Sequence, residues 1–278
     1  MNANWLPQMP VIKDWLADAS LKLSKAGIPS PDLDAEIILS NCMLKNRTYL
    51  HAYPEAKIDT ETLSKVDEII EQRLKRIPLA YLFGYKEFYG REFQITKDTL
   101  IPRPESETII DILKQINTDK ISNLIDIGTG SGCLGISAKL EEPDLDVTLS
   151  DVSPEALEIA KINADRLKAT VDLIESDLLA SINNKFDIII ANLPYVDKDW
   201  ARSPETNYEP SLALFADNSG KQLIEKLVIQ SINTLNNGGY LIIEADPEQH
   251  PSLIQFATEK SFKLFIQQDY IIAFRYLS

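Results

Sequence analysis

The chain has 278 residues, of which 44% are hydrophobic and 25% are charged, a composition typical of a globular protein with room for two domains. Its net charge of -14 argues against binding to a nucleic-acid backbone, because that affinity depends on lysine and arginine side chains that neutralise phosphates. The two cysteines, Cys42 and Cys133, lie far apart in sequence, so neither a disulfide framework nor a cysteine metal site is indicated.

The first 80 residues are predicted to form a small helical domain. Residues 1–5 lack the charged and apolar regions of a secretion signal, and no apolar run in the chain approaches the roughly 18 residues of a membrane helix. We therefore expect a cytoplasmic protein without a membrane segment. Apolar residues then recur at helical spacing, with prolines between the segments, over 11–23, 33–44 and 63–74.

Residues 81–106 are predicted to connect this domain to the next one. Aromatic and β-branched residues predict a β-hairpin over 85–95. A proline-stiffened loop follows at 100–105 and carries Arg103 and Glu105. These two charged residues fit either a substrate entrance or a structural ion pair, and the sequence leaves both interpretations open.

Residues 107–278 are predicted to form an α/β domain with a doubly wound, mostly parallel sheet of seven strands. A helix at 108–116 leads into an alternation of strand-like runs and helical segments. The last two runs are separated by only four residues, which is too short for a parallel crossover, so we expect an antiparallel final strand. The predicted strands are 124–127, 147–150, 171–174, 186–191, 240–244, 262–266 and 271–276.

A glycine-rich turn follows the first of these strands and opens a helix. It reads Asp126-Ile127-Gly128-Thr129-Gly130-Ser131-Gly132. Its glycines would let the backbone approach a ligand closely, and Asp126 could accept a hydrogen bond from a cationic amine. Asp151 ends the next strand, where an acidic side chain can accept both hydroxyls of a ribose, and Asp177 follows the third strand, where it could contact an adenine edge. Together these positions predict a site for a cofactor that contains adenosine.

The same turn is compatible with a nicotinamide-binding Rossmann domain, since residues 130–135 satisfy the loose dinucleotide fingerprint. Two observations argue against a nicotinamide cofactor. The first glycine of that fingerprint, Gly130, lies two residues farther from the strand end than the fingerprint requires. A second motif, at residues 192–195, would also have no role in hydride transfer.

The second motif, Asn192-Leu193-Pro194-Tyr195, follows the apolar run at 186–191. An amide nitrogen is a poor nucleophile because its lone pair is delocalised, so an enzyme that methylates it must orient the NH2 group and stabilise the developing positive charge. The side-chain oxygen of Asn192 and the carbonyl of Leu193 can each accept one N–H, and Tyr195 can stack on the planar group. A strand-ending asparagine with a proline turn can also be purely structural. Its position, one strand beyond the predicted cofactor turn, favours methyl transfer onto an amide or amine nitrogen.

With these motifs, the sequence resembles the class I methyltransferases that use S-adenosylmethionine, and within them the HemK/PrmC family, which methylates a glutamine of peptide chain release factors. The resemblance covers nearly the whole chain, and its most specific parts are residues 78–93 and 100–105. Residues 33–39 are similar to the substrate-recognition domain of that family. The implied domains are a helical substrate-recognition domain at 1–80, a hairpin and loop linker at 81–106, and a Rossmann-like methyltransferase domain at 107–278.

The resemblance also implies roles for individual residues. The glycine turn would contact the cofactor, Asp151 would bind its ribose, and Asn192 would touch both its methionine part and the substrate glutamine. The product would be S-adenosylhomocysteine, and no metal is implied. The implied cofactor-binding residues are Asp126, Gly128, Thr129, Gly130, Ser131, Gly132, Asp151, Asp177, Leu178 and Asn192, and the implied catalytic residues are Asn192, Leu193, Pro194 and Tyr195.

Two positions depart from the family pattern. The family usually has a proline where this chain has Leu193, so the carbonyl acceptor remains while a ring that fixes φ at about −65° is absent. Leu178 stands where relatives commonly carry an aromatic residue beside the adenine, so ring stacking is not expected there.

The implied substrate is the glutamine of a Gly-Gly-Gln tripeptide in bacterial release factors, whose basic surface an acidic enzyme would suit. We expect a monomer that makes no direct contact with nucleic acid. Three alternatives stay open: methylation of a glutamine in a large-subunit ribosomal protein, methylation of exocyclic amines in DNA or RNA, and a binding module without activity. The negative charge argues against the nucleic-acid substrate, and the retained Asn192 argues against the inactive module.

Histidine chemistry is not expected in this chain. It has only two histidines, His51 and His250, and methyl transfer from a sulfonium needs neither a histidine base nor a histidine metal cluster. His250 lies next to Pro251 and is predicted at the surface. Cys133, in the helix after the glycine turn, is predicted to be a small packing residue.

Overall fold

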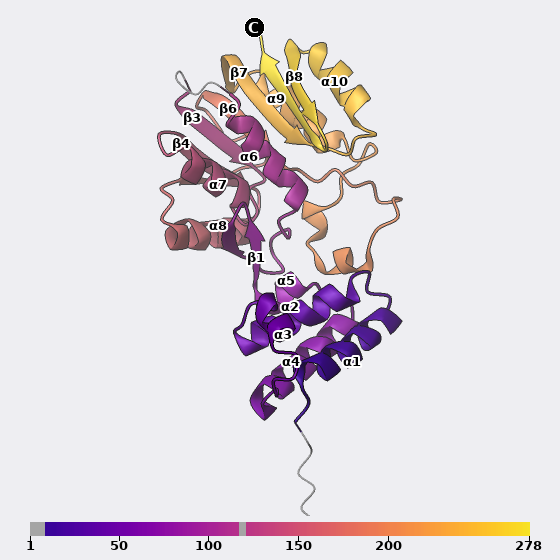
Figure 1. Cartoon of the computed structure of the whole chain (residues 1–278). Coiled ribbons are helices and arrows are strands. Elements are labelled where there is room, and N and C mark those ends of the chain that lie inside the picture. Colours follow the sequence, from indigo (N-terminus) through magenta and orange to yellow (C-terminus); the bar gives the residue numbers. More distant parts are fainter. Residues whose placement is uncertain (1–8, 117–120) are drawn as a thin grey trace, which may run out of the picture. The chain divides into compact units, whose positions relative to one another are not determined.

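A computed structural model describes residues 9–116 and 121–278 (Figure 1). The chain divides into two compact units, one that ends at Phe83 and one that spans Gly84–Ser278. Residues 1–5, on which the expectation of no secretion signal rests, lie outside the described residues.

The first unit is helical. Its helices pack apolar faces around a buried core that includes Trp15, Ile38 and Val66. Sequence periodicity found the three long helices and missed the two short ones, because a helix of five or six residues presents too few turns for a period to appear. Over residues 9–83 the helices are α1 (Ile12–Lys25), α2 (Pro31–Met43), α3 (Arg47–Ala52), α4 (Thr60–Leu74) and α5 (Leu79–Phe83).

The predicted hairpin is present and belongs to the second unit. Its strands, β1 (Tyr85–Phe88) and β2 (Arg91–Gln94), pair in antiparallel register. Both Phe88 and Phe93 are buried in the core of this unit, with their rings edge to face at 6.2 Å. The hairpin is therefore anchored by its own aromatic side chains.

The second unit is built on a sheet of seven strands in the order β5-β4-β3-β6-β7-β9-β8. The first five strands of this sheet in chain order, β3 to β7, pair in parallel. The last strand, β9, pairs in antiparallel register with both β7 and β8, as predicted from the short connection between β8 and β9. The strands are β3 (Asn123–Ile127), β4 (Asp146–Asp151), β5 (Asp172–Glu175), β6 (Phe186–Ala191), β7 (Leu235–Glu244), β8 (Phe262–Gln268) and β9 (Ile271–Tyr276).

Helices cover both faces of this sheet. Successive residues of a strand point to opposite faces. Leu124 and Ile188 accordingly pack in one core with the helices α6, α7 and α8, while Ile125 and Ile189 pack in the other with α9 and α10. The helices are α6 (Glu107–Leu113), α7 (Cys133–Glu141), α8 (Pro154–Leu167), α9 (Gln222–Ser231) and α10 (His250–Thr258), with short 3-10 turns η1 (Pro104–Ser106), η3 (Pro204–Tyr208) and η4 (Ser211–Ala213).

The strand order reverses between β3 and β6, which are neighbours in the sheet although two strands separate them in the chain. From β3 the chain first builds outward through β4 and β5, then returns to β6 and builds in the other direction. In open α/β sheets, ligands bind outside the carboxyl ends of the strands at such a reversal. The glycine turn follows β3 and the Asn192 motif follows β6, so both motifs lie at this point.

The prediction for His250 is wrong. Its side chain is buried, and its ring nitrogens lie 3.1 Å from the Ala245 carbonyl oxygen and 3.1 Å from Nε2 of Gln267. Pro251 occupies the first turn of α10 rather than a surface loop. That position suits a proline, because its missing N–H would have no partner in a first helical turn.

A buried asparagine connects the hairpin to the glycine turn. Asn163 of α8 has no exposed surface, and its Nδ2 donates to the carbonyl oxygens of Gln94 (2.8 Å) and Ser131 (2.9 Å). Its Oδ1 accepts from the backbone N–H of Gln94 at 2.7 Å. One side chain thus bridges three elements that are distant in sequence.

We expect Asn163→Ala to lower the free energy of unfolding by about 2–4 kcal/mol, because it leaves several buried backbone groups without partners. Chemical denaturation of the purified protein measures the change. The control is Asn184→Ala, at an exposed position of the same residue type, which should change stability by less than about 0.5 kcal/mol. Equal effects of the two substitutions would contradict the bridging role.

Candidate active site

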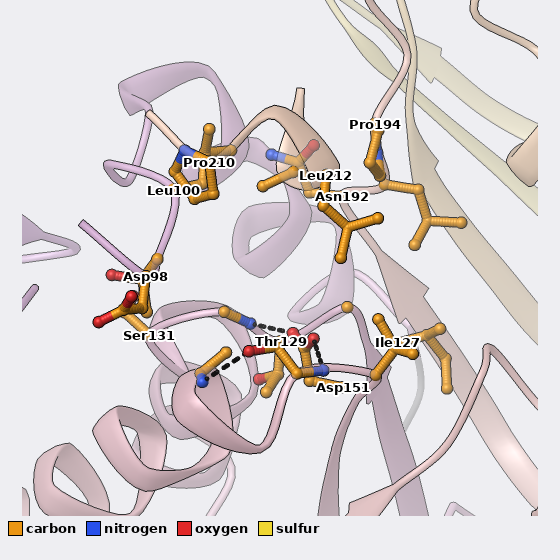
Figure 2. Close-up of a pocket in the computed structure, with 18 of the residues that line it drawn as sticks. Asp98, Leu100, Ile127, Thr129, Ser131, Asp151, Asn192, Pro194, Pro210 and Leu212 are labelled. Carbon is orange, nitrogen blue, oxygen red and sulfur yellow. Dashed lines mark hydrogen bonds between the residues drawn. The ribbon is translucent and has the colours of Figure 1, made fainter. Parts of the chain in front are cut away.

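A cavity of about 380 Å³ lies at the carboxyl ends of β3, β4 and β6. This volume falls within the range of roughly 300–1,000 Å³ that small-molecule sites occupy. Figure 2 shows Leu100, Pro210 and Leu212 on the side of the cavity opposite Thr129 and Asp151. The residues predicted from sequence that line the cavity are Gly128, Thr129, Gly130, Ser131, Asp151, Asp177, Leu178, Asn192, Leu193 and Pro194.

The glycine turn has the backbone conformation that its sequence predicts. Gly128 has a φ of +70°, a region that residues with a Cβ rarely adopt. A Cβ at this position would also lie 2.9 Å from Cδ2 of Leu193. The backbone N–H groups of Gly128 and Thr129 both donate to the Ser150 carbonyl oxygen, at 2.8 and 3.0 Å, which fixes the turn against β4. The first motif is therefore shaped to fit beside the second.

Asp126 lies beneath this turn and does not line the cavity. Its Oδ2 accepts hydrogen bonds from the Thr129 hydroxyl at 2.6 Å and from the backbone N–H of Gly135 at 2.9 Å. Its other oxygen, Oδ1, is buried and has no hydrogen-bond partner among the residues that the structure describes. Burial raises the pKa of this carboxyl to about 6, and the bonds from Thr129 and Gly135 oppose that rise. The turn thus encloses a buried negative charge with one unpaired oxygen.

Asp151 lines the cavity and also supports the turn. Its Oδ2 accepts from the backbone N–H of Gly130 at 2.9 Å, and its Oδ1 accepts from the backbone N–H of Ser153 at 3.0 Å. Burial raises the pKa of this carboxyl, against the lowering effect of these bonds. Each carboxylate oxygen has a second lone pair, so the side chain can still accept hydroxyl groups from a ligand in the cavity.

The third strand contributes Asp177 and Leu178 to the cavity lining. The Asp177 carboxylate forms an ion pair with Nζ of Lys226 at 2.7 Å and is largely exposed. Leu178 is buried, and its φ of +54° turns the chain at this point. The cavity therefore has an aliphatic wall where the family pattern would place an aromatic ring.

The Asn192 motif follows β6 and is held from two directions. Nδ2 of Asn192 donates to the Ser106 hydroxyl oxygen at 2.9 Å. The Tyr195 hydroxyl donates to Oε1 of Glu244 at 2.8 Å, and the Tyr195 carbonyl oxygen accepts from Nε2 of Gln249 at 2.9 Å. Tyr195 does not line the cavity, and neither does Gly132.

Leu193, in place of the family's proline, has a buried side chain that packs in the core below β6. Among the residues that the structure describes, its carbonyl oxygen accepts no hydrogen bond. The acceptor that the second motif requires is therefore still available to a ligand.

Sequence reasoning missed three residues that support this site. Ser106 and Glu244 are buried polar residues beside Asn192 and Tyr195, and the Ser106 hydroxyl is hydrogen bonded to Oε2 of Glu244. Glu209 lies in the long connection after β6. The one available signal was the position of Glu244 at the carboxyl end of a central strand, where an acidic side chain has few structural uses.

Arg103 both forms an ion pair and lines the cavity. Its guanidinium pairs with Oε1 of Glu209 at 2.5 Å rather than with Glu105, which is exposed. The other oxygen of Glu209 accepts from the backbone N–H of Ile101 at 3.2 Å. Because Arg103 and Pro210 both line the cavity, this buried carboxylate connects two chain segments of its lining.

Other chemistry is not apparent in the described ranges. Cys133 lines the cavity, and burial raises the pKa of its thiol to about 12, so it is not a thiolate nucleophile. No group of three or more His, Cys, Asp or Glu side chains in residues 9–116 and 121–278 is arranged to hold a metal ion. Within the same residues, no helix is both long enough and apolar enough to span a membrane.

Known proteins share both parts of the chain. The family model of the PrmC N-terminal domain matches residues 14–84, and that of the methyltransferase small domain matches residues 106–206. The release factor glutamine methyltransferase of Koribacter versatilis is 38% identical over 242 residues, which cover 83% of this chain and 86% of that protein. The enzyme of the same name from Deinococcus radiodurans is 34% identical over 246 residues, which cover 87% of this chain and 88% of that protein.

One solved structure is similar in fold to a large part of this chain. It is a 16S rRNA methyltransferase of Thermus thermophilus in complex with S-adenosylmethionine and guanosine, and it matches with a TM-score of 0.50 at 16% identity. The match covers 70% of this chain and 50% of that chain. At this identity the likeness establishes a class I methyltransferase fold and no more.

We expect Asp126→Asn to make the protein more stable at neutral pH, by up to about 3 kcal/mol. The native pKa of about 6 lies above the ordinary value of 3.8, so the native state holds this proton more tightly than the unfolded state. The contribution of Asp126 to the unfolding free energy of the wild type therefore falls as pH rises from about 4 to about 6 and stays lower above that range. Asparagine does not titrate, so this fall in unfolding free energy is absent from the Asp126→Asn variant.

Denaturation curves at several pH values measure the difference between variant and wild type. Asp146→Asn, at an exposed carboxylate on β4, is the matched control for the removal of one negative charge. A variant with the wild-type slope between pH 4 and 6 would show that Asp126 does not titrate as described.

Proposed function

The chain belongs to the release factor glutamine methyltransferase family, and we propose that it methylates the side-chain amide nitrogen of the glutamine in the Gly-Gly-Gln tripeptide of bacterial release factors. The observation that carries this proposal is the identity of 34% and 38%, over more than four-fifths of each chain, to two enzymes of that name. The chain is thus a methyltransferase, and its substrate is a protein.

The methyl donor in this proposal is S-adenosylmethionine, and S-adenosylhomocysteine is the product. The bound cofactor supplies a methyl group on a positively charged sulfur, which is an electrophile. The buried, unpaired oxygen of Asp126 favours the cationic methionine end of such a molecule above the glycine turn. Asp151 would accept the ribose hydroxyls, and Leu178 would contact the adenine through its aliphatic side chain.

Asn192 and Leu193 would hold the amide to be methylated. The Asn192 side-chain oxygen and the Leu193 carbonyl oxygen can each accept one N–H of the substrate NH2, which aims the nitrogen at the methyl carbon. The same oxygens stabilise the positive charge that forms on nitrogen as the new C–N bond forms. The nitrogen then loses a proton to solvent, so no buried base is needed. Stacking of Tyr195 on the substrate stays a prediction, since its ring lies outside the cavity lining.

The substrate would be recognised by more than the tripeptide. The helical unit matches the PrmC N-terminal domain, and we propose that it binds the body of the release factor. The chain's net charge of -14 suits a basic protein surface and disfavours a polyphosphate. Because release factors act on cytoplasmic ribosomes, the enzyme would work in the cytoplasm. We propose that it acts as a monomer without direct contact with nucleic acid.

The purified enzyme should transfer labelled methyl groups from S-adenosylmethionine to a purified release factor, and a Gly-Gly-Ala variant of that factor should stay unlabelled. The reason is that only the glutamine amide presents an NH2 group to the two acceptors at this position. Scintillation counting of the separated proteins measures the transfer.

Parallel reactions with large-subunit ribosomal proteins, bulk RNA and DNA distinguish the alternative substrates. Label on a ribosomal protein or on nucleic acid, with none on the release factor, would contradict the proposed substrate. Label on nothing, in an enzyme that binds the cofactor, would point to a module without activity.

We expect Asn192→Ala to lower kcat by about 10²–10³-fold, because it removes an acceptor directed at the charge that develops in the transition state. Cofactor affinity, measured by calorimetry with S-adenosylhomocysteine, should change much less. Asn233→Ala, at an exposed position, serves as the control. Equal losses in kcat and in cofactor affinity would assign Asn192 to cofactor binding instead.

A further inference from the structure

Two buried residues outside the sequence motifs form a hydrogen-bonded chain that ends on Asn192. Glu244, at the end of β7, is 1% exposed, and Ser106, just before α6, is 2% exposed. Nδ2 of Asn192 lies 2.9 Å from the Ser106 hydroxyl oxygen, which in turn is bonded to Oε2 of Glu244. The Tyr195 hydroxyl occupies the other oxygen of Glu244 at 2.8 Å. One carboxylate is therefore the end point for two residues of the second motif.

The protons in this chain can be assigned by counting donors. An ionised carboxylate only accepts hydrogen bonds, so the single proton of the Ser106 hydroxyl must point at Glu244. Ser106 can then offer Asn192 nothing except a lone pair. The Asn192 amide consequently has to turn its NH2 group toward Ser106, which directs its oxygen away from Ser106.

We propose that Glu244 and Ser106 are positioning residues that hold the Asn192 amide with its oxygen toward the substrate nitrogen. This inference rests on the proposed function, in which that oxygen accepts an N–H from the glutamine amide. With the opposite orientation, Asn192 would present an NH2 group to another NH2 group. The two donors would repel each other, although every catalytic residue would still be present.

The substitution Glu244→Gln tests the direction of the hydrogen bonds between Glu244, Ser106 and Asn192 while keeping the shape of the side chain. With its oxygen toward the Tyr195 hydroxyl, which donates at this position in the native protein, the glutamine places its NH2 group toward Ser106. The Ser106 proton would then point at Asn192 and attract the oxygen of its amide. We therefore expect kcat to fall by about 10- to 100-fold, the usual cost of losing a residue that orients a catalytic group. Cofactor affinity should change little, and the melting temperature should not fall, because the substitution removes a buried charge.

The substitution Ser106→Ala breaks the hydrogen-bonded connection between Glu244 and Asn192. It should lower kcat by about 10-fold, because Asn192 is then free to adopt both orientations. Adding Glu244→Gln to this variant should have almost no further effect, since the changed polarity can no longer reach Asn192. If the two residues instead acted on kcat independently of each other, the two losses would multiply.

A pH profile gives an additional readout. Burial raises the pKa of Glu244, against the lowering effect of the Ser106 and Tyr195 hydroxyls. At saturating cofactor, kcat of the wild type should fall on acidification, and Glu244→Gln should lack that fall, because only the protonated carboxyl can donate to Ser106. The titratable and charged groups that face Glu244 are Tyr195 after β6, Arg103 and Glu105 before α6, and Cys133 in α7. Ser106 also contacts Glu244 but does not titrate.

The side-chain amide signals of Asn192 in a 15N-labelled sample separate this inference from the function that it rests on. They should shift in Glu244→Gln without any substrate present, and stay unchanged in Glu248→Gln, which removes an exposed charge nearby. Unchanged amide signals, or multiplicative losses in the double variant, would overturn the inference. An active wild type without methyl transfer to release factor would overturn the proposed function alone.

Discussion

The site depends on the parallel pairing of β3 with β6, two strands that are neighbours in space and distant in sequence. This pairing aligns Ile127 with Ala191, the last residue of each strand, so the chain leaves both strands at the same level. The glycine turn and the Asn192 motif begin there side by side. The contact of Leu193 with Gly128 is a direct result, because a Cβ on the glycine would collide with the leucine side chain. The glycine turn and the Asn192 motif thus share one edge of the sheet because the strand order reverses at that point.

Buried carboxylates surround this edge, and each is stabilised mainly by neutral donors. Asp126 and Asp151 accept hydroxyl and backbone N–H groups, and Glu244 accepts two hydroxyls. Burial of a charge costs several kcal/mol unless it is well solvated by such groups, and the raised pKa values of these three carboxyls show that the compensation is partial. The fold therefore gives up stability here, and it does so where a cationic cofactor and a developing positive charge would be bound. Glu209, by contrast, pairs with Arg103 and closes a wall of the cavity.

The sequence predicted the sheet, the hairpin and both motifs because each has a local signature. Apolar runs such as 186–191 mark central strands, and positive-φ glycines such as Gly128 mark a turn that few other residues can adopt. It placed the start of β7 five residues too late, because Gly238 and Gly239 look like a turn and in fact lie within a strand whose register shifts. It could not find Ser106 or Glu244, since their roles come from contacts over 86 and 138 residues of chain. The prediction that His250 lies at the surface was wrong for the same reason, because its partners are set by the tertiary fold.

The exchange of proline for Leu193 can be understood from the same contacts. A proline in this motif restricts φ of one residue and so limits the unfolded chain as well as the native one. Leucine lacks that restriction, yet its buried side chain packs in the core below β6 and against Gly128, so tertiary contacts hold the backbone in its place. The neighbouring residues are fixed independently, Asn192 through Ser106 and Tyr195 through Glu244 and Gln249. The carbonyl of Leu193 is therefore constrained from both sides, and the two acceptors of the motif persist although leucine replaces the first proline of the family pattern.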